Sequence, residues 1–192
     1  MKKLTKEAIS RSFETMLDKM PFDKITVSAL VKECGINHNT FYYYYQDIYQ
    51  LLNEWITQKL GKYAQNDTAD DLEEGIKALL HSCQLHKKTI YHIFDSLSRD
   101  HLERYLFSCA DDILYRFICH QANGKEITED QLQNIASFCR YALTGFFLRF
   151  LWDGMQADIE QSINALSPMF RGFIAQSIKQ FACPDLESPA AN

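Results

Sequence analysis

Apolar residues recur every three or four positions along most of this chain, the spacing that places them on one face of an α-helix. Short polar segments that carry capping and breaking residues separate these runs. The pattern predicts helices over residues 6–20, 26–34, 37–45, 47–60, 72–83, 87–95, 99–121, 130–153 and 158–182. Seven glycines and four prolines in 192 residues are too few for a loop-rich sandwich or barrel. The sequence therefore predicts an all-α fold.

The expected helix ends coincide with residues that favour them. Side-chain oxygens that can cap a helix N-terminus occur at Thr5, Thr26, Asn37 and Asp47. Gly35 can adopt the positive φ that ends a helix. Pro168 lies inside the last apolar run, where it predicts a kink or a break.

The chain divides into parts of different character. Residues 61–71 are polar and without pattern, which makes them the strongest candidate for a boundary between two functional parts. We assign residues 1–50 to a small N-terminal domain and residues 51–182 to a larger helical domain. Residues 183–192 contain Pro and Ser and are expected to form a frayed tail.

Residues 26–45, TVSALVKECGINHNTFYYYY, predict a helix-turn-helix: a capped two-turn helix, a turn containing glycine, and a second capped helix. The N-terminal residues of such a second helix face base edges when the helix lies in the major groove of DNA. Helical geometry sends Phe41 and Tyr45 to a shared core face. The expected DNA contacts are small, planar or phenolic side chains, namely Thr26, Ser28, Asn37, His38, Asn39, Thr40, Tyr42, Tyr43 and Tyr44.

The charge distribution also favours residues 1–50, and no other region, as the part that meets DNA. The whole chain carries a net charge of −5, which disfavours a polyanionic partner. Residues 1–50 contain seven cations and six acids, a net of +1, so residues 51–192 carry −6. Only the first fifty residues can therefore approach DNA without net repulsion.

Residues 5–55 resemble the N-terminal domain of the TetR/AcrR family of transcriptional regulators. The matching positions are Ile25-Thr26-Val27, Cys34-Gly35-Ile36, Thr40-Phe41-Tyr42, Tyr45, Asp47 and Leu51-Leu52. The resemblance implies a three-helix DNA-binding domain followed by a helical ligand-binding and dimerisation domain. It also implies phosphate contacts from Tyr42 and Tyr44, with Asn37, His38, Asn39 and Tyr43 near the bases. The chain departs from the family at Ile48, where a lysine is common, and at Asn39, where glycine is frequent.

The second part resembles, over residues 143–155, a subgroup that includes activators of dihydroxyacetone-kinase operons. In the family the last two helices form the interface between subunits. By that analogy the interface candidates, with core packing as the alternative, are Phe146, Phe150, Phe170 and Phe173. Aromatic residues that could line a pocket for an apolar inducer, or simply fill the core, are Phe94, Tyr105, Tyr115, Phe138 and Tyr141.

These features predict a cytoplasmic homodimer that binds a near-palindromic operator and responds to a small molecule, more often as a repressor than as an activator. A helical protein–protein adaptor that uses the tyrosine cluster is the alternative, in which DNA plays no part. We expect no catalysis, because none of the common nucleotide-binding or hydrolase motifs occurs. Neither a metal nor a cofactor is expected. Cys83 and His86 share a helical face and could ligate zinc, but His81 lies on another face, which favours a surface His pair beside a buried Cys. No apolar run is long enough to span a membrane.

Overall fold

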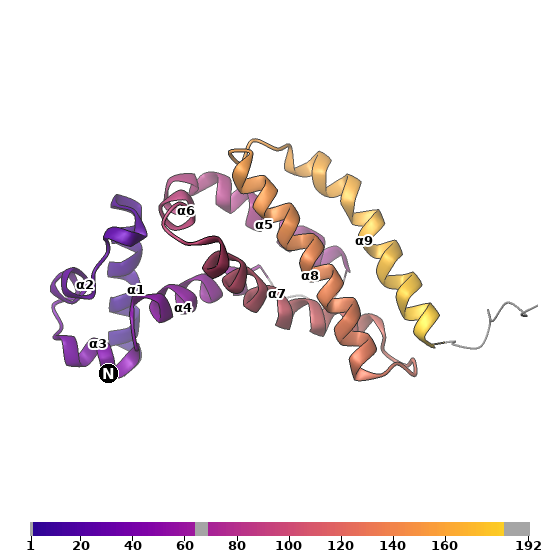
Figure 1. Ribbon diagram of the computed structural model, residues 1–192, viewed down its shortest axis with the longest axis horizontal. Helices are drawn as coiled ribbons and strands as arrows, with labels where there is room; N and C mark the ends of the chain where they lie inside the picture. Colours follow the sequence, from indigo (N-terminus) through magenta and orange to yellow (C-terminus); the bar gives the residue numbers. More distant parts are fainter. Residues whose placement is uncertain (1, 64–68, 183–192) are drawn as a thin grey trace, which may run out of the picture. The chain divides into compact units, whose positions relative to one another are not determined.

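The computed structural model describes residues 2–63 and 69–182, and every regular element within those residues is helical (Figure 1). The predicted all-α class is confirmed. The elements are α1 (Lys2–Lys19), the 3₁₀ helix η1 (Phe22–Lys24), α2 (Val27–Cys34), α3 (His38–Tyr44), α4 (Ile48–Gly61), α5 (Ala69–Leu85), α6 (Lys87–Phe94), α7 (Arg99–Gln121), α8 (Glu129–Trp152) and α9 (Ile159–Ala182).

The predicted helix ends agree with the structure to within two residues except at the starts of α1 and α5. The prediction that Thr5 caps the first helix is wrong, because α1 already begins at Lys2 and Thr5 lies inside it. Pro168 neither splits nor ends α9, which continues as one helix on both sides of it. The tail at 183–192 and residues 64–68 of the expected boundary lie outside the described residues.

The backbone divides into two compact units that differ from the functional division expected from the sequence. The first unit contains Met1–Lys62 and Ser82–Tyr105, and the second contains Tyr63–His81 and Leu106–Asn192. Helices α5 and α7 each contribute one end to the first unit and the rest to the second. Compactness and function are separate criteria, so the domain limits at residues 50 and 182 stay predictions.

The core of the first unit joins α1 to the helix-turn-helix. Ile9, Phe13 and Leu17 on α1 are completely buried, and they belong to the same apolar cluster as Leu30 on α2 and Phe41 on α3. Helix α6 packs on α1 in this unit. The apolar face of α1 therefore packs against α2 and α3 and holds them in place.

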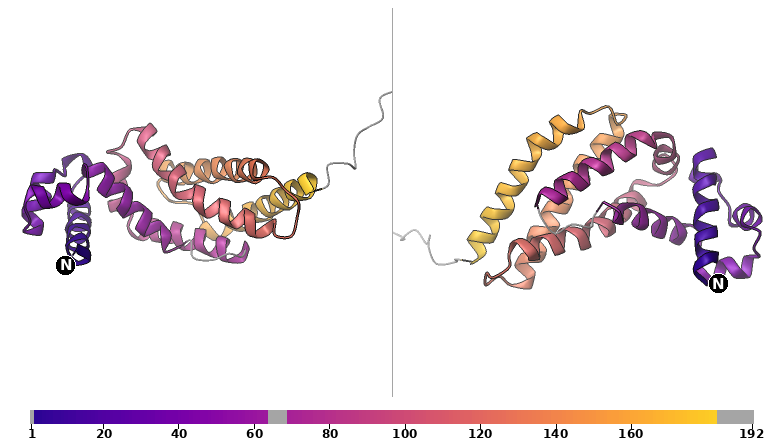
Figure 2. Two further views of the ribbon diagram at one scale, coloured as in Figure 1. Left: turned by 90° about the horizontal axis from the view of Figure 1, so that it is seen from below. Right: turned by 180° about the vertical axis from the view of Figure 1, so that it is seen from behind.

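The second unit is built from long helices. Helices α8 and α9 are joined by a short turn and run side by side in opposite directions in all three ribbon views (Figures 1 and 2). The core of the unit lies between α7, α8 and α9 and includes Leu114, Ile118, Cys139 and Ile174. A capping box starts α8, in which Thr128 and Gln131 each bond the other's backbone N–H.

Candidate nucleic-acid interface

The turn between α2 and α3 is closed by local hydrogen bonds that its residues encode. Gly35 has φ +67°, and its N–H and that of Ile36 bond to the carbonyls of Lys32 and Val31. This is the Schellman arrangement, which needs a residue that tolerates the left-handed region. At the other end of α2, Thr26 Oγ1 accepts a hydrogen bond from the Ala29 N–H. Both predicted ends of α2 are confirmed.

The start of α3 presents polar side chains whose roles the geometry separates. Asn37 Oδ1 accepts hydrogen bonds from the Thr40 N–H at 2.8 Å and from the Thr40 hydroxyl at 3.0 Å. Its oxygen is thus committed to the cap, whereas a bidentate contact with adenine needs both the oxygen and the nitrogen of an amide. Asn39 is exposed on the first turn and has no such cap role. It is the asparagine better placed to contact a base.

A hydrogen bond between side chains connects the two helices of the motif. Ser28 Oγ on α2 lies 3.1 Å from His38 Nε2 at the first residue of α3. Both residues are exposed. This hydrogen bond holds the His38 ring against α2 on the exposed side of the motif.

The four consecutive tyrosines have three different environments. Tyr42 and Tyr43 are exposed, and Tyr45 is buried, as predicted. Tyr44 was expected to be exposed with its neighbours, but it is half-buried and packs against the core of the first unit. Its ring also meets that of Tyr43 edge to face, with 5.0 Å between the centroids. The exposed phenols are thus those of Tyr42 and Tyr43.

Several cations of the first unit are engaged by acids within it. Lys6 pairs with Glu54 at 2.7 Å, and Lys59 pairs with Glu14. Glu54 also accepts a hydrogen bond from the buried Tyr45 hydroxyl, and the pKa of Tyr45 is raised by burial and by this carboxylate. Ile48, which replaces the lysine common in the family, packs against the core. Lys6 and Lys59 are thus paired within the unit, and Ile48 adds no positive charge.

Helix α6 is bonded to the C-terminal end of α1 within the first unit. His92 Nδ1 lies 2.5 Å from the carbonyl oxygen of Leu17, and the Thr89 hydroxyl donates to Asp18 at 2.5 Å. Because α1 packs against the helix-turn-helix, a displacement of α6 would move α1 and, with it, α2 and α3.

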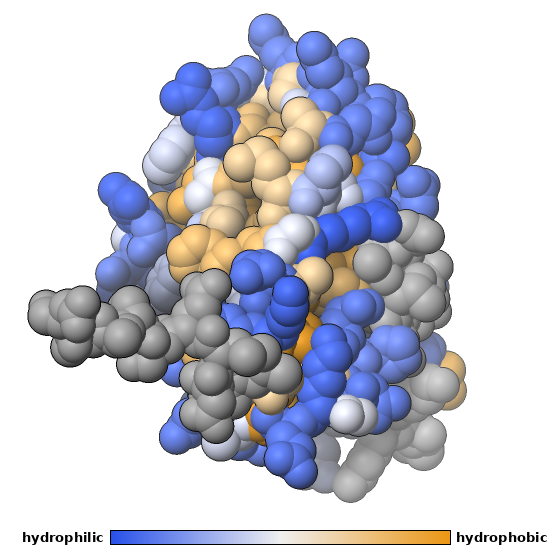
Figure 3. Space-filling view, turned by 90° about the vertical axis from the view of Figure 1, so that its right-hand side faces the viewer, coloured by the Kyte–Doolittle hydropathy of each residue, from blue (hydrophilic) through white to orange (hydrophobic). Residues whose placement is uncertain are grey.

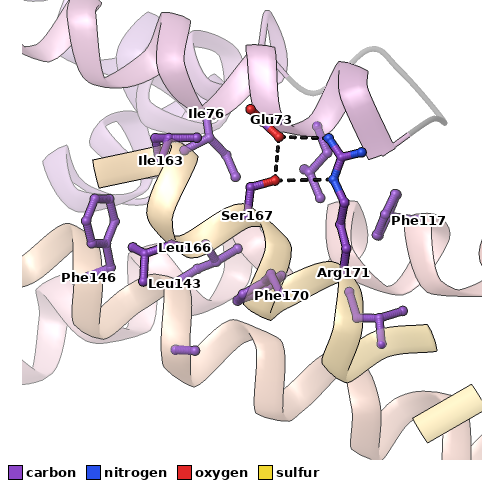
Figure 4. Close-up of a pocket in the computed structure, with 13 residues that line it drawn as sticks. Glu73, Ile76, Phe117, Leu143, Phe146, Ile163, Leu166, Ser167, Phe170 and Arg171 are labelled. Carbon is purple, nitrogen blue, oxygen red and sulfur yellow. Dashed lines mark hydrogen bonds and ion pairs between the residues drawn. The ribbon is translucent and has the colours of Figure 1, made fainter. Parts of the chain in front are cut away.

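The second unit contains a pocket of about 190 Å³ between α5, α7, α8 and α9 (Figure 4). Its walls are mostly aliphatic and aromatic, and its polar side chains gather at one edge. There Glu73 accepts hydrogen bonds from the Ser167 hydroxyl and from the Arg171 guanidinium. We call Glu73, Ser167 and Arg171 the polar corner. Sequence reasoning missed it, although Ser167 and Arg171 are four residues apart on one helical face.

The aromatic residues expected to form a pocket do not line this one. Phe94 and Tyr105 are half-buried in the first unit, where the Tyr105 hydroxyl donates to the Tyr49 carbonyl. Tyr115 packs against the core of the second unit. Phe138 and Tyr141 are 57% and 58% exposed. The structure therefore does not bring the five together.

An apolar face covers the outer sides of α8 and α9. The large hydrophobic residues exposed on these two helices are Phe138, Tyr141, Trp152, Leu166, Met169 and Phe173, of which Leu166 also lines the pocket and Tyr141 meets the ring of Phe107 on α7. The rings of Phe138 and Phe173 stack across the two helices with 4.3 Å between centroids. Seen from the right-hand side of Figure 1, apolar side chains form a band flanked by polar ones (Figure 3). We call this set the α8/α9 face. Exposed apolar surface of this kind is typical of a contact surface.

Of the four phenylalanines expected at a subunit interface, only Phe173 belongs to the α8/α9 face. Phe146 and Phe170 line the pocket, and Phe150 is 2% exposed and belongs to the interior. Helix α8 is apolar on more than one side. Spacing alone could not show which side faces outward.

Comparison with known families identifies the chain. Residues 14–55 match the family model described as bacterial regulatory proteins of the tetR family, and residues 70–172 match the model described as transcriptional regulator C-terminal region. The second match covers more than half of the sequence. The chain belongs to the TetR family of bacterial transcriptional regulators. The resemblance found in residues 5–55 is thereby confirmed.

Solved structures share the TetR fold at low sequence identity. The dihydroxyacetone kinase operon activator DhaS has a TM-score of 0.59 and 16% identity, over 93% of this chain and 98% of that one. NalD, the secondary repressor of the MexAB-OprM multidrug efflux pump in Pseudomonas aeruginosa, has a TM-score of 0.51 and 14% identity, over 90% of this chain and 98% of that one. No curated protein sequence matches the chain.

Membership of the TetR family decides between the two functions that the sequence left open. TetR-family regulators have a DNA-binding N-terminal domain and a C-terminal ligand-binding domain, and they bind operator DNA as homodimers. The chain is thus a DNA-binding regulator rather than an adaptor. Among the helices that the structure describes, none is both long and apolar enough to cross a bilayer.

Proposed function

We propose that α3 enters the major groove of an operator and that Asn39, His38 and Tyr43 lie near base edges. Asn39 is favoured for sequence reading because the Asn37 oxygen is already used twice within the cap. The exposed Tyr42 hydroxyl is assigned to a phosphate, which positions the protein without reading sequence. The observation that carries this proposal is the polar, exposed start of α3 above a closed apolar core.

We further propose that two copies associate through the α8/α9 face and bind two half-sites of a near-palindrome. The support is the stacked Phe138–Phe173 pair beside Met169, which is 71% exposed. A single short recognition helix reads few base pairs, so pairing the helices multiplies both affinity and specificity. We propose Phe173 as an interface residue, as the sequence analysis expected. We also propose Phe138 and Tyr141 as interface residues, although they were expected to line a pocket.

Regulation is proposed to pass along α5 into α6. Helix α5 carries Glu73 of the polar corner and leads directly into α6, which is bonded to α1. A small molecule that binds better to one conformer would shift the population between operator-binding and non-binding states. We propose that the protein represses transcription. We propose that it does so by binding DNA rather than by catalysis, and that it acts in the cytoplasm, where its DNA target lies. DhaS is named an activator and NalD a repressor, so the shared fold leaves the sign to a reporter assay.

The test is selection of bound duplexes from a random pool, followed by affinity measurements on the selected operator. Asn39→Ala should change the base preferred at one position per half-site, with a loss of about tenfold or more on the parent operator. Tyr42→Phe should weaken binding to selected and random duplexes by a similar factor, because only a phosphate contact is lost. If both variants bind all duplexes like the parent protein, the assigned surface is wrong.

A further inference from the structure

The pocket of the second unit combines two features that restrict what it can bind. Its volume is about 190 Å³, and its side walls are formed by side chains such as Ile76, Leu143, Phe146 and Phe170 (Figure 4). An apolar cavity of about 150 Å³ in another protein is large enough for benzene. The space here is about a quarter larger and therefore suits a substituted benzene of about eight non-hydrogen atoms.

The polar corner is already neutral without a ligand. Glu73 accepts from the Ser167 hydroxyl, from Arg171 at 2.8 Å and from Lys77 at 3.2 Å. These bonds lower the pKa of Glu73 to about 2, with the Ser167 bond making the largest contribution, so the carboxylate stays ionised at neutral pH. Lys77 is shared in turn with Glu74 and Glu160, neither of which lines the pocket.

This neutrality makes a charged ligand unfavourable. A cationic head would have to compete with both Arg171 and Lys77 for the Glu73 carboxylate, whose side chain is only 17% exposed. An anionic head on Arg171 would lie beside the same carboxylate and be repelled by it. A ligand hydroxyl can donate to Ser167 Oγ, whose own hydrogen is donated to Glu73, and a ligand carbonyl can accept from Arg171. Neither hydrogen bond separates the ion pair.

We propose that this pocket is the effector site and that it takes an uncharged, mainly apolar molecule of benzene-ring size with one hydroxyl or carbonyl group directed at the polar corner. The biological meaning of this site rests on the proposed ligand-responsive function, but the binding step is independent of DNA. Filling the apolar walls supplies the affinity, and the corner selects against charge.

The test is calorimetric titration of the full-length protein, without DNA, with four probes of similar shape. We expect 4-ethylphenol to bind at least about tenfold more tightly than 4-methylbenzoate or 4-methylbenzylammonium, because the Glu73 carboxylate repels the first charged head and is already paired with Arg171 and Lys77 against the second. It should also bind more tightly than 4-ethyltoluene, which has the same outline but no hydroxyl. Tighter binding of either charged probe would overturn the ligand class.

Two variants locate the binding site. Ile76→Phe adds volume to the pocket wall and should reduce 4-ethylphenol binding by about tenfold, because the added ring competes with the ligand for the same space. Ala78→Phe is the matched control, because Ala78 lies on the same helix and is exposed outside the pocket. Equal binding by the parent and Ile76→Phe, with both proteins folded by circular dichroism, would overturn the pocket assignment.

A third variant tests the polar corner separately. Ser167→Ala should reduce the preference for 4-ethylphenol over 4-ethyltoluene to less than about twofold, since the hydroxyl that distinguishes the probes loses its partner. An unchanged preference would contradict the proposed orientation. Operator affinity is then measured with and without 4-ethylphenol: pocket binding with no change in operator affinity supports this site and contradicts only the proposed regulation.

Discussion

The helix-turn-helix of α2 and α3 and the pair α8 and α9 differ in how their helices are specified. Each short helix of the motif has a side-chain cap at its start, and α2 ends in a glycine with positive φ, so local residues define both helices. Helices α8 and α9 each contain 24 residues and carry apolar side chains on more than one side. Local chemistry thus defines the two helices proposed to meet DNA, whereas packing partners define the faces of the long helices.

The comparison predicts the largest loss at a core residue of the motif. Phe41→Ala should destabilise the first unit by about 3–5 kcal/mol and abolish operator binding, because Phe41 is completely buried. Tyr43→Ala, two residues away at 64% exposure, should change stability by less than about 0.5 kcal/mol and still weaken operator binding. Thermal unfolding and operator titration separate the two effects. Equal stability losses would refute the assigned faces of α3.

The next effect should appear on the α8/α9 face. Gly145 lies seven residues after Phe138 on the same side of α8, and a Cβ placed there meets no atom within 4 Å. Gly145→Arg should therefore be accommodated by each copy alone, but it should block the partner and lower operator affinity at least about a hundredfold. Sedimentation should show a monomer. Gly61→Arg, also in open space at the end of α4, is the control that should stay dimeric.

A smaller effect should follow pH at the polar corner. The pKa of Glu73 falls from 4.5 to about 2 in the folded protein, so its stabilising contribution is complete above pH 4.5 and is lost as the pH falls towards 2. After allowance for solvent screening this contribution is about 1–2 kcal/mol. Glu73→Gln should show a shallower loss of stability over that interval in urea unfolding. Glu74→Gln, at a side chain 73% exposed, should follow the parent curve.

The smallest effect is expected at the hydrogen bond between α2 and α3. Ser28→Ala should cost about 0.5–1 kcal/mol of operator binding and relax base preference where His38 contacts DNA. The losses from Ser28→Ala and His38→Ala should be non-additive, because both remove one interaction. Ser28→Thr should restore the preference. Additive losses in competition binding would show that Ser28 does not orient His38.

The sequence predicts those parts of the candidate site in which a side chain bonds to the backbone only a few residues away. The caps at Thr26, Asn37 and Asp47 are such cases, and each bonds the N–H three residues ahead. Tyr44 shows the limit: its place in the tyrosine run suggests exposure, but its ring packs against the core of the first unit. The polar corner was beyond prediction, because Glu73 and Ser167 are 94 positions apart and only the packing of α5 on α9 brings them together.

The sequence by itself determined the helical class, the capped helix-turn-helix and the family, because helix periodicity, capping and turn conformation act over a few residues. Only the tertiary structure decided that Phe150 is interior, that Phe146 and Phe170 line a pocket and that Phe138 lies outside beside Phe173. A phenylalanine gains from burial in a core, a pocket wall or a subunit interface by the same hydrophobic effect. The spacing of a phenylalanine along a helix therefore predicts that it is buried. The packing of the neighbouring helices determines whether it is buried in a core, a pocket wall or a subunit interface.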